Sequence, residues 1–192
     1  MDGQNLFHAA REAFGYSYPN YDPQLLAGKV CAKAGWSLAQ VRFYTGVPDP
    51  VDNPAWHRFW AKKLAVMGTR GIWTFKRPLR YRHETVTLPD GKQIPLLVGR
   101  EKGIDVRLAL DVVRLALDGS LDVALIFSQD QDLSEVADEV RFISMKQDRW
   151  IKVASAFPQS PGSKNRRGIN GTQWVSVEQP LYDTCLDPND YR

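Results

Sequence analysis

Two aspartates follow an apolar stretch in the second half of the chain. Residues 123–128 are almost continuously apolar, which is typical of a strand buried on both faces of a parallel sheet. Asp130 and Asp132 come directly after it, where functional groups gather in wound α/β sheets. A carboxylate at such a place needs a cation, an amide cluster or a basic side chain as its partner. For Asp132 a second interpretation stays open, in which it caps the next helix together with Glu135.

A third aspartate, Asp105, stands at the start of a helix that periodicity predicts over residues 105–117. Charged residues recur on this helix at intervals of four, three and four and form one stripe: Arg107, Asp111, Arg114 and Asp118. At about 100° per residue, Asp105 lies opposite that stripe among apolar residues, so its carboxylate faces inward. It either caps the helix or belongs to a site shared with the acids after the strand. We expect Asp111 and Asp118 to be solvated and paired with arginines of their own helix.

Several carboxylates at one edge of a sheet repel each other unless a divalent cation neutralises them. Hard oxygen ligands suit Mg²⁺ or Mn²⁺, and such an ion activates water and stabilises a phosphodiester during hydrolysis. The histidines lack metal-ligand spacing, and neither a GxSxG motif nor a phosphate-binding loop of the GxxxxGK type occurs. The acids therefore predict a metal-dependent nuclease. A nucleotide or sugar-phosphate transferase that uses the Asp130/Asp132 pair is a less favoured alternative.

The elements that must position these acids alternate along the chain. Apolar periodicity predicts helices over residues 6–14, 24–34, 55–67, 105–117 and 133–145. It predicts strands over residues 40–44, 71–75, 123–128 and 151–156, and a hairpin of residues 80–88 and 93–98 around an Asp-Gly turn. This order predicts an α/β fold with a central parallel sheet. After residue 157 we expect a basic loop and a C-terminal tail.

Length and composition limit the remaining possibilities. A chain of 192 residues suffices for a single domain over residues 1–192, with its core at residues 2–157. No apolar run is long enough to cross a membrane, and Cys31 and Cys185 form no CxxC pair, so we expect a cytoplasmic protein with reduced thiols. A net charge of +3 is too small to indicate a polyanionic partner by itself.

Three short segments resemble the motifs of the NYN domain, a branch of the PIN-like nucleases that includes the LabA-like proteins. They are DGQNL at residues 2–6, KGIDV at residues 102–106 and SQDQDL at residues 128–133. The resemblance implies a three-layer α/β/α PIN-like (Rossmann-like) fold with a central parallel sheet, here with an added β-hairpin. It also implies an endoribonuclease that hydrolyses single-stranded RNA.

The resemblance further implies a role for individual residues. The principal ligands of Mg²⁺ or Mn²⁺ would be Asp2, Asp105 and Asp130, with Asp132 as an auxiliary ligand. Asn5 would orient this catalytic group. Lys102 and Ser128 would contact the substrate or its phosphate.

Two features of the motifs differ from the usual family pattern. No strand is predicted before Asp2, although the first acid of the family usually ends an apolar strand. Gln129 and Gln131 stand where small residues are common, and we expect them to crowd the site. Crowding favours an alternative in which the protein is a catalytically inactive RNA-binding or scaffold module. A homodimer is left open.

Basic residues cluster in two segments that could follow a phosphate backbone. The late loop contains Lys164, Arg166 and Arg167, and it follows a strand whose end lies at the same edge as the acids. We therefore predict that this loop binds substrate. The start of the hairpin carries a second group, whose interpretation as an RNA surface or as a solvated hairpin stays open: Lys76, Arg77, Arg80, Arg82 and His83.

Overall fold

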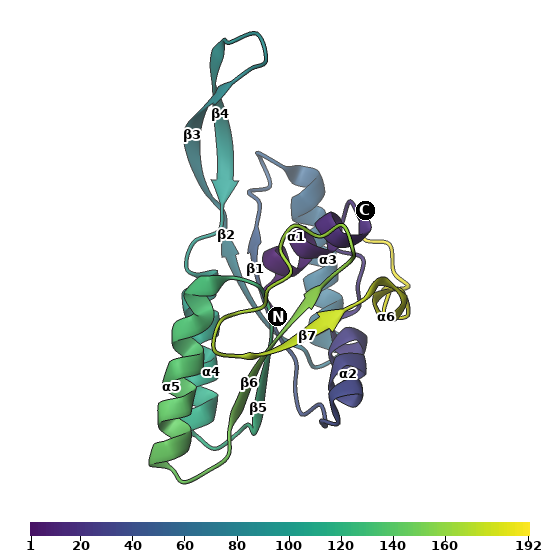
Figure 1. Cartoon of the computed structure of the whole chain (residues 1–192). Helices are drawn as coiled ribbons and strands as arrows, with labels where there is room; N and C mark the ends of the chain where they lie inside the picture. Colours follow the sequence, from purple (N-terminus) through teal and green to yellow (C-terminus); the bar gives the residue numbers. More distant parts are fainter.

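All residues from Met1 to Arg192 are described by the computed structural model, in which helices surround parallel strands (Figure 1). The first half contains α1 (Gly3–Phe14), α2 (Pro23–Ala34), β1 (Arg42–Val47), α3 (Pro54–Thr69), β2 (Trp73–Pro78), β3 (Arg80–Thr87) and β4 (Gln93–Arg100). The second half contains α4 (Ile104–Leu117), β5 (Val123–Phe127), η1 (Gln131–Leu133), α5 (Ser134–Lys146), β6 (Lys152–Pro158), β7 (Gln173–Val177) and α6 (Gln179–Asp183). Every helix and strand predicted from the sequence is present, with ends that differ by a few residues.

The first two residues join two groups of parallel strands into one layer. β1 pairs with β2, and β5, β6 and β7 pair in that order. The Tyr44 amide donates to the Met1 carbonyl at 3.0 Å, and the Asp2 amide donates to the Phe127 carbonyl at 3.2 Å. Met1 and Asp2 thus hold a strand position between β1 and β5. The sequence predicted no strand before Asp2. In the structure, Met1 and Asp2 themselves occupy that strand position.

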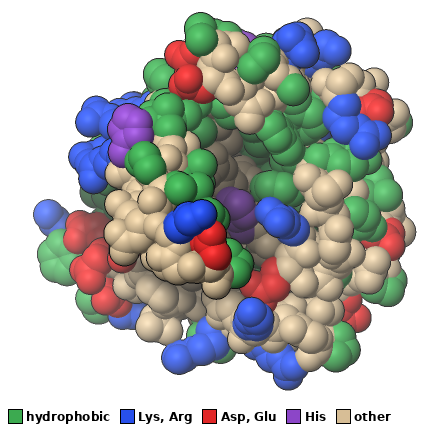
Figure 2. All heavy atoms as spheres, turned by 90° about the horizontal axis from the view of Figure 1, so that it is seen from above, with side chains coloured by type: hydrophobic (Ala, Val, Ile, Leu, Met, Phe, Trp, Pro, Cys, Tyr) green, Lys and Arg blue, Asp and Glu red, His purple; other side chains and the backbone are tan.

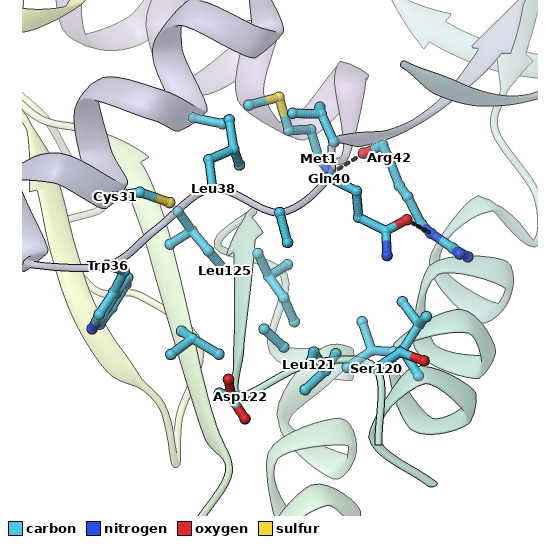
Figure 3. A pocket seen from close by; sticks show the side chains of 18 of the residues that line it. Met1, Cys31, Trp36, Leu38, Gln40, Arg42, Ser120, Leu121, Asp122 and Leu125 are labelled. Carbon is cyan, nitrogen blue, oxygen red and sulfur yellow. Dashed lines mark hydrogen bonds between the residues drawn. The ribbon is translucent and has the colours of Figure 1, made fainter. Parts of the chain in front are cut away.

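A cavity lies beside Met1, and residues of β1 and β5 contribute to its lining (Figure 3). The cavity has a volume of about 440 Å³ and is lined mostly by hydrophobic side chains of α2, β1, α4, β5 and the loop before β1. The Met1 amino group donates to the Arg42 carbonyl at 2.7 Å, and burial lowers the pKa of this amino group to about 5.

Helices cover both faces of the strands and create two separate apolar cores. On one face α1, α2 and α3 pack their apolar residues against β1 in a cluster that includes Leu6, Leu26 and Phe59. On the other face α4 and α5 lie side by side, and Leu108 and Val140 belong to the second cluster (Figure 1). The architecture is therefore the three-layer α/β/α arrangement that the sequence predicted. None of the helices combines the length and the apolar character that a membrane span requires.

Local sequence signals set the helix ends, as α2 illustrates. The Asp22 carboxylate accepts hydrogen bonds from the backbone amides of Gln24 and Leu25 at 2.9 and 3.0 Å. Pro23 occupies the first turn, where its missing amide costs no hydrogen bond. The helix ends at Gly35, whose φ of 75° is a left-handed conformation that glycine adopts without strain.

The β3–β4 hairpin projects from the body of the molecule (Figure 1). Its strands are antiparallel, with Thr87 opposite Gln93, and the Asp90 carboxylate accepts from the Lys92 amide at 3.1 Å within the turn. The predicted hairpin is confirmed. Most of its side chains are exposed.

The C-terminal segment was expected to be a loop and a tail, and this prediction missed β7 and α6. β7 extends the sheet in parallel with β6. Beyond it, Tyr182, Cys185 and Tyr191 are buried in the first core cluster, and Lys63 donates to the Asp187 carboxylate at 2.9 Å. The tail is thus tied to the body by apolar packing and a buried ion pair. Cys185 forms no disulfide, as the sequence predicted.

One charge on α4 is placed differently from the prediction. Asp111 was expected to be solvated, yet it is only 2% exposed. Its carboxylate accepts from the Tyr44 hydroxyl at 2.9 Å and pairs with Arg107 at 3.0 Å and with Arg42 at 3.5 Å. Asp111 therefore packs against β1, which supplies two of these partners, whereas Arg114 and Asp118 of the same stripe are exposed. The predicted pairing of Asp111 with an arginine of its own helix is confirmed.

Candidate active site

The acids predicted from the sequence lie at the carboxyl ends of the parallel strands. Asp2 ends the short segment between β1 and β5, Asp130 follows β5, and Asp105 lies in the first turn of α4. Viewed from above, this side of the molecule contains a hollow with Lys, Arg and acidic side chains at its rim (Figure 2). The cavity beneath Met1 is a different feature, because none of these acids lines it.

Asp2 is the most enclosed of these acids, with 6% exposure. Its Oδ1 accepts from the Asn5 amide at 3.0 Å, which caps α1, and the Ser128 hydroxyl lies 3.5 Å from its Oδ2. Burial raises the pKa of Asp2, and the charge of Asp130 raises this pKa further against those hydrogen bonds. Asp2 and Asp130 are therefore electrostatic neighbours although 128 positions separate them in the sequence.

The third motif is held to the first by backbone and side-chain hydrogen bonds. Asn5 Oδ1 accepts from the Gln129 amide at 2.9 Å. Ser128 Oγ accepts from the Asp130 amide at 3.2 Å. Because Ser128 is 1% exposed, it connects the neighbourhood of Asp2 with that of Asp130 from below the surface.

Asp132 does not cap the following helix. The residue that caps this turn is Asp130, whose Oδ1 accepts from the Asp132 amide at 3.1 Å. The N-cap residue of α5 is Leu133, which provides no side-chain cap, so the predicted capping box with Glu135 is wrong. The chain enters α5 through the short helix η1, which moves the capping position from Asp132 to Asp130. Asp132 itself is exposed.

Asp105 is not a helix cap either. The N-cap of α4 is Gly103, with φ of 73° and no side-chain hydrogen bond to the helix start. Asp105 is half-buried, as its inward position on the helix predicted. Asp105 thus makes no capping hydrogen bond, and its membership of a shared site stays a prediction.

A fourth acid, Glu101, was missed by the sequence analysis. Its carboxylate accepts from the Gly46 amide, and a Cβ atom at Gly46 would lie 2.6 Å from Glu101 Cγ, so the close approach requires glycine. Burial raises the pKa of Glu101 to about 8, and the charges of Asp2 and Asp105 contribute to this increase. The only sequence signal was an acid directly before the KGIDV motif. Together we call Asp2, Glu101, Asp105 and Asp130 the acidic centre.

The acidic centre fits a divalent cation in its chemistry but does not form a ready ligand set. All four side chains offer hard carboxylate oxygens, and a cation would offset the burial and the like charge that raise the pKa values of Asp2 and Glu101. No three His, Cys, Asp or Glu side chains are arranged to hold a metal ion together.

The sequence analysis expected Gln129 and Gln131 to crowd the site, but these side chains do not crowd the acidic centre. Their side chains extend instead to the backbone of residues 163–170, which we call the basic loop, and bond its carbonyl and amide groups. The prediction of crowding is wrong because these long amide side chains find backbone partners outside the site.

The predicted substrate-binding cations are exposed and have no carboxylate partner within 4.0 Å: Lys102, Lys164, Arg166 and Arg167. Arg166 Nε donates to the Ser163 carbonyl at 3.1 Å within the loop. The Arg167 guanidinium lies 5.9 Å from the ring centroid of Trp174, which is 44% exposed. These positive charges are therefore available to an anionic ligand.

An α/β/α fold with acids clustered at the carboxyl ends of its parallel strands defines the PIN-like class of nuclease folds. The family model for the NYN domain matches residues 1–147 of the chain. The protein therefore belongs to the NYN domain family, within the PIN-like nuclease superfamily. No similar curated protein and no similar solved structure was found.

Proposed function

We propose that this protein is a metal-dependent endoribonuclease that hydrolyses single-stranded RNA. The observation that carries the proposal is the gathering of carboxyl groups in the acidic centre, where burial raises the pKa values of Asp2 and Glu101, the charge of Asp130 adds to the first increase, and the charges of Asp2 and Asp105 add to the second. Acids brought together at a cost to their ionisation are typical of sites that bind a cation or perform acid–base chemistry. Family membership adds the nuclease class.

In this proposal the acidic centre holds one or two Mg²⁺ or Mn²⁺ ions. The principal ligands are Asp2, Asp105 and Asp130, and Glu101 lies beside them, with Asp132 as an auxiliary ligand from the exposed side. A bound ion supplies an activated water and neutralises charge on the phosphodiester. Asn5 and Ser128 keep the first and third motifs in register through their hydrogen bonds to Gln129 and Asp130.

The cations beside the centre would bind the RNA backbone. Lys102 begins the loop into α4, and Lys164, Arg166 and Arg167 lie on the basic loop. Phosphate contacts of this kind carry no base information, so the shape and flexibility of a single strand would select the substrate.

The direct test is cleavage of a single-stranded RNA with Mg²⁺ or Mn²⁺ by the wild-type protein and by Asp130→Asn. We expect the variant to lose at least about 100-fold in rate, because a ligand carboxylate becomes a neutral amide. Asp118→Asn is the matched control, since Asp118 is an exposed aspartate that pairs with Arg114 on the same helix as Asp105. Equal cleavage by wild type and Asp130→Asn would remove the proposal.

A second candidate is an RNA-binding or scaffold module without catalysis. The observation that favours it is the lack of three carboxylates arranged to hold a metal ion. Titration with Mn²⁺ followed by calorimetry separates the candidates. Heat from binding that disappears in Asp130→Asn supports the nuclease, whereas retained RNA affinity without divalent binding supports the scaffold.

A further inference from the structure

The basic loop is attached to the third motif by the two glutamines that flank Asp130. Gln129 Nε2 donates to the Asn165 carbonyl at 3.3 Å and to the Arg167 carbonyl at 2.9 Å. Gln131 Nε2 donates to the Gly168 carbonyl at 3.0 Å, and Gln131 Oε1 accepts from the Asn170 amide at 3.1 Å. Each glutamine therefore bonds the loop at two points of its backbone.

Other contacts fix both ends of the same loop. Glu12 on α1 accepts from the Lys164 amide at 2.7 Å. At the other end, Ile169 is fully buried, and its amide donates to Ser155 Oγ at 3.1 Å. Gly168 lies so close to β6 and β7 that a Cβ atom there would be 2.7 Å from Trp174 Cδ1. The glutamines thus bridge the middle of a segment that is anchored at its two ends.

The loop backbone is bonded inward, whereas its cations remain exposed. Lys164, Arg166 and Arg167 have no acidic partner within 4.0 Å, although Asp130 of the acidic centre belongs to the motif that holds their backbone. A loop ordered before its ligand arrives loses less conformational entropy on binding, which increases affinity. The arrangement has the features of a preformed surface for a polyanion.

We propose that Gln129 and Gln131 are positioning residues that clamp the basic loop beside the acidic centre as a preformed phosphate-binding surface for single-stranded RNA. The inference rests on the proposed function, because it assigns the clamp to the substrate of that same site. The clamp acts on binding and leaves the chemical step unchanged. The backbone of Asp130 is fixed separately, by Ser128 Oγ on its own amide and by Asn5 on the Gln129 amide.

The test compares Gln129→Met/Gln131→Met with wild type in RNA cleavage kinetics. Methionine keeps the length of the side chain and removes its donors and acceptor. We expect KM to rise about tenfold while kcat changes by less than about twofold, since phosphate contacts far from the reacting bond stabilise the bound substrate and the transition state equally. Gln147→Met is the matched control, because Gln147 makes the same kind of bond to the Leu117 carbonyl, at 3.0 Å, between α5 and α4.

Two measurements separate a clamp from a general loss of structure. The salt dependence of the affinity for a fluorescent single-stranded RNA, measured in EDTA, should decrease in slope by about 2 in the double variant, at about 0.7 for each lost phosphate contact. Hydrogen exchange should become faster at residues 163–170 and remain unchanged in α4 and α5.

The possible results distinguish this inference from the proposed function. If wild type cleaves RNA and the double variant matches it in KM and in salt slope, the clamp is wrong and the nuclease stands. If wild type neither binds nor cleaves RNA, the nuclease proposal fails and the RNA role of the clamp fails with it. Unchanged exchange in the basic loop of the double variant would refute the clamp irrespective of RNA.

Discussion

The acidic centre and the basic loop are neighbours, but the structure disfavours charge in the first and leaves charge exposed in the second. In the acidic centre, burial and like charge raise the pKa values of Asp2 and Glu101, so the folded protein disfavours their ionised forms. In the basic loop the backbone is bonded at many points while Lys164 and Arg167 stay exposed and have no acidic partner. The structure therefore places carboxyl groups whose ionisation is disfavoured near positive charges that lack acidic partners.

This difference indicates what kind of ligand would compensate the charges of each region. A divalent cation would compensate the acids, and a phosphate backbone would compensate the cations. Direct ion pairs between the two regions would satisfy both without any ligand, yet no such pair is present. The glutamine bonds contribute to this separation, because they hold the loop by its backbone and leave its cationic side chains exposed.

The largest expected effect comes from removing one charge of the acidic centre. Asp105→Asn should lower the rate of RNA cleavage at least about 100-fold through loss of a metal ligand. The same change should raise the Tm by a few degrees without added metal, because Asp105 is a like-charge neighbour of Glu101. Cleavage assays and thermal unfolding in EDTA check the two effects.

Gain of stability with loss of activity is the result that identifies a ligand site. If Asp105→Asn lowers the Tm and cleaves RNA as wild type does, Asp105 has a structural role and is not part of the ligand set. Asp118→Asn on the same helix serves again as the control and should change neither quantity.

A smaller effect is expected from the cationic side. Lys164→Ala/Arg167→Ala should raise KM about tenfold, leave kcat within about twofold, and lower the salt slope of RNA binding by about 1.4, or about 0.7 for each phosphate contact. Lys33→Ala/Arg114→Ala removes the same charge from exposed positions on α2 and α4 and should leave the slope unchanged. A similar decrease in both double variants would mean that the net charge of the protein, and no local surface, attracts RNA.

The two regions also differ in how far the sequence could predict them. Asp105 and Asp130 were found because helical periodicity and an apolar strand define directions and ends from local pattern alone. Glu101 was missed because an acid between Arg100 and Lys102 resembles a solvated charge in the sequence. Only its contact with Gly46, 55 positions away, makes it buried.

The same limit explains the errors at Asp111 and in the basic loop. Helical phase correctly grouped Asp111 with Arg107. The burial of Asp111, however, depends on Tyr44 of β1, which is distant in sequence. The partners of Gln129 and Gln131 are carbonyl and amide groups in a loop whose path no periodicity describes. Long-range packing therefore decides what each charged or amide side chain does.

The smallest predicted effect concerns the pH dependence of stability and tests the cost of ionising Glu101, which burial and the neighbouring acids increase. Glu101 has its pKa raised from 4.5 to about 8, so between these pH values the folded state retains a proton that the unfolded state has released. The contribution of Glu101 to the free energy of unfolding therefore falls as the pH rises through this window. Glu101→Gln removes that titration. Its Tm relative to wild type should increase by a few degrees from pH 5 to pH 8, measured by thermal unfolding in EDTA, whereas a constant difference would show that Glu101 ionises without cost in the folded protein.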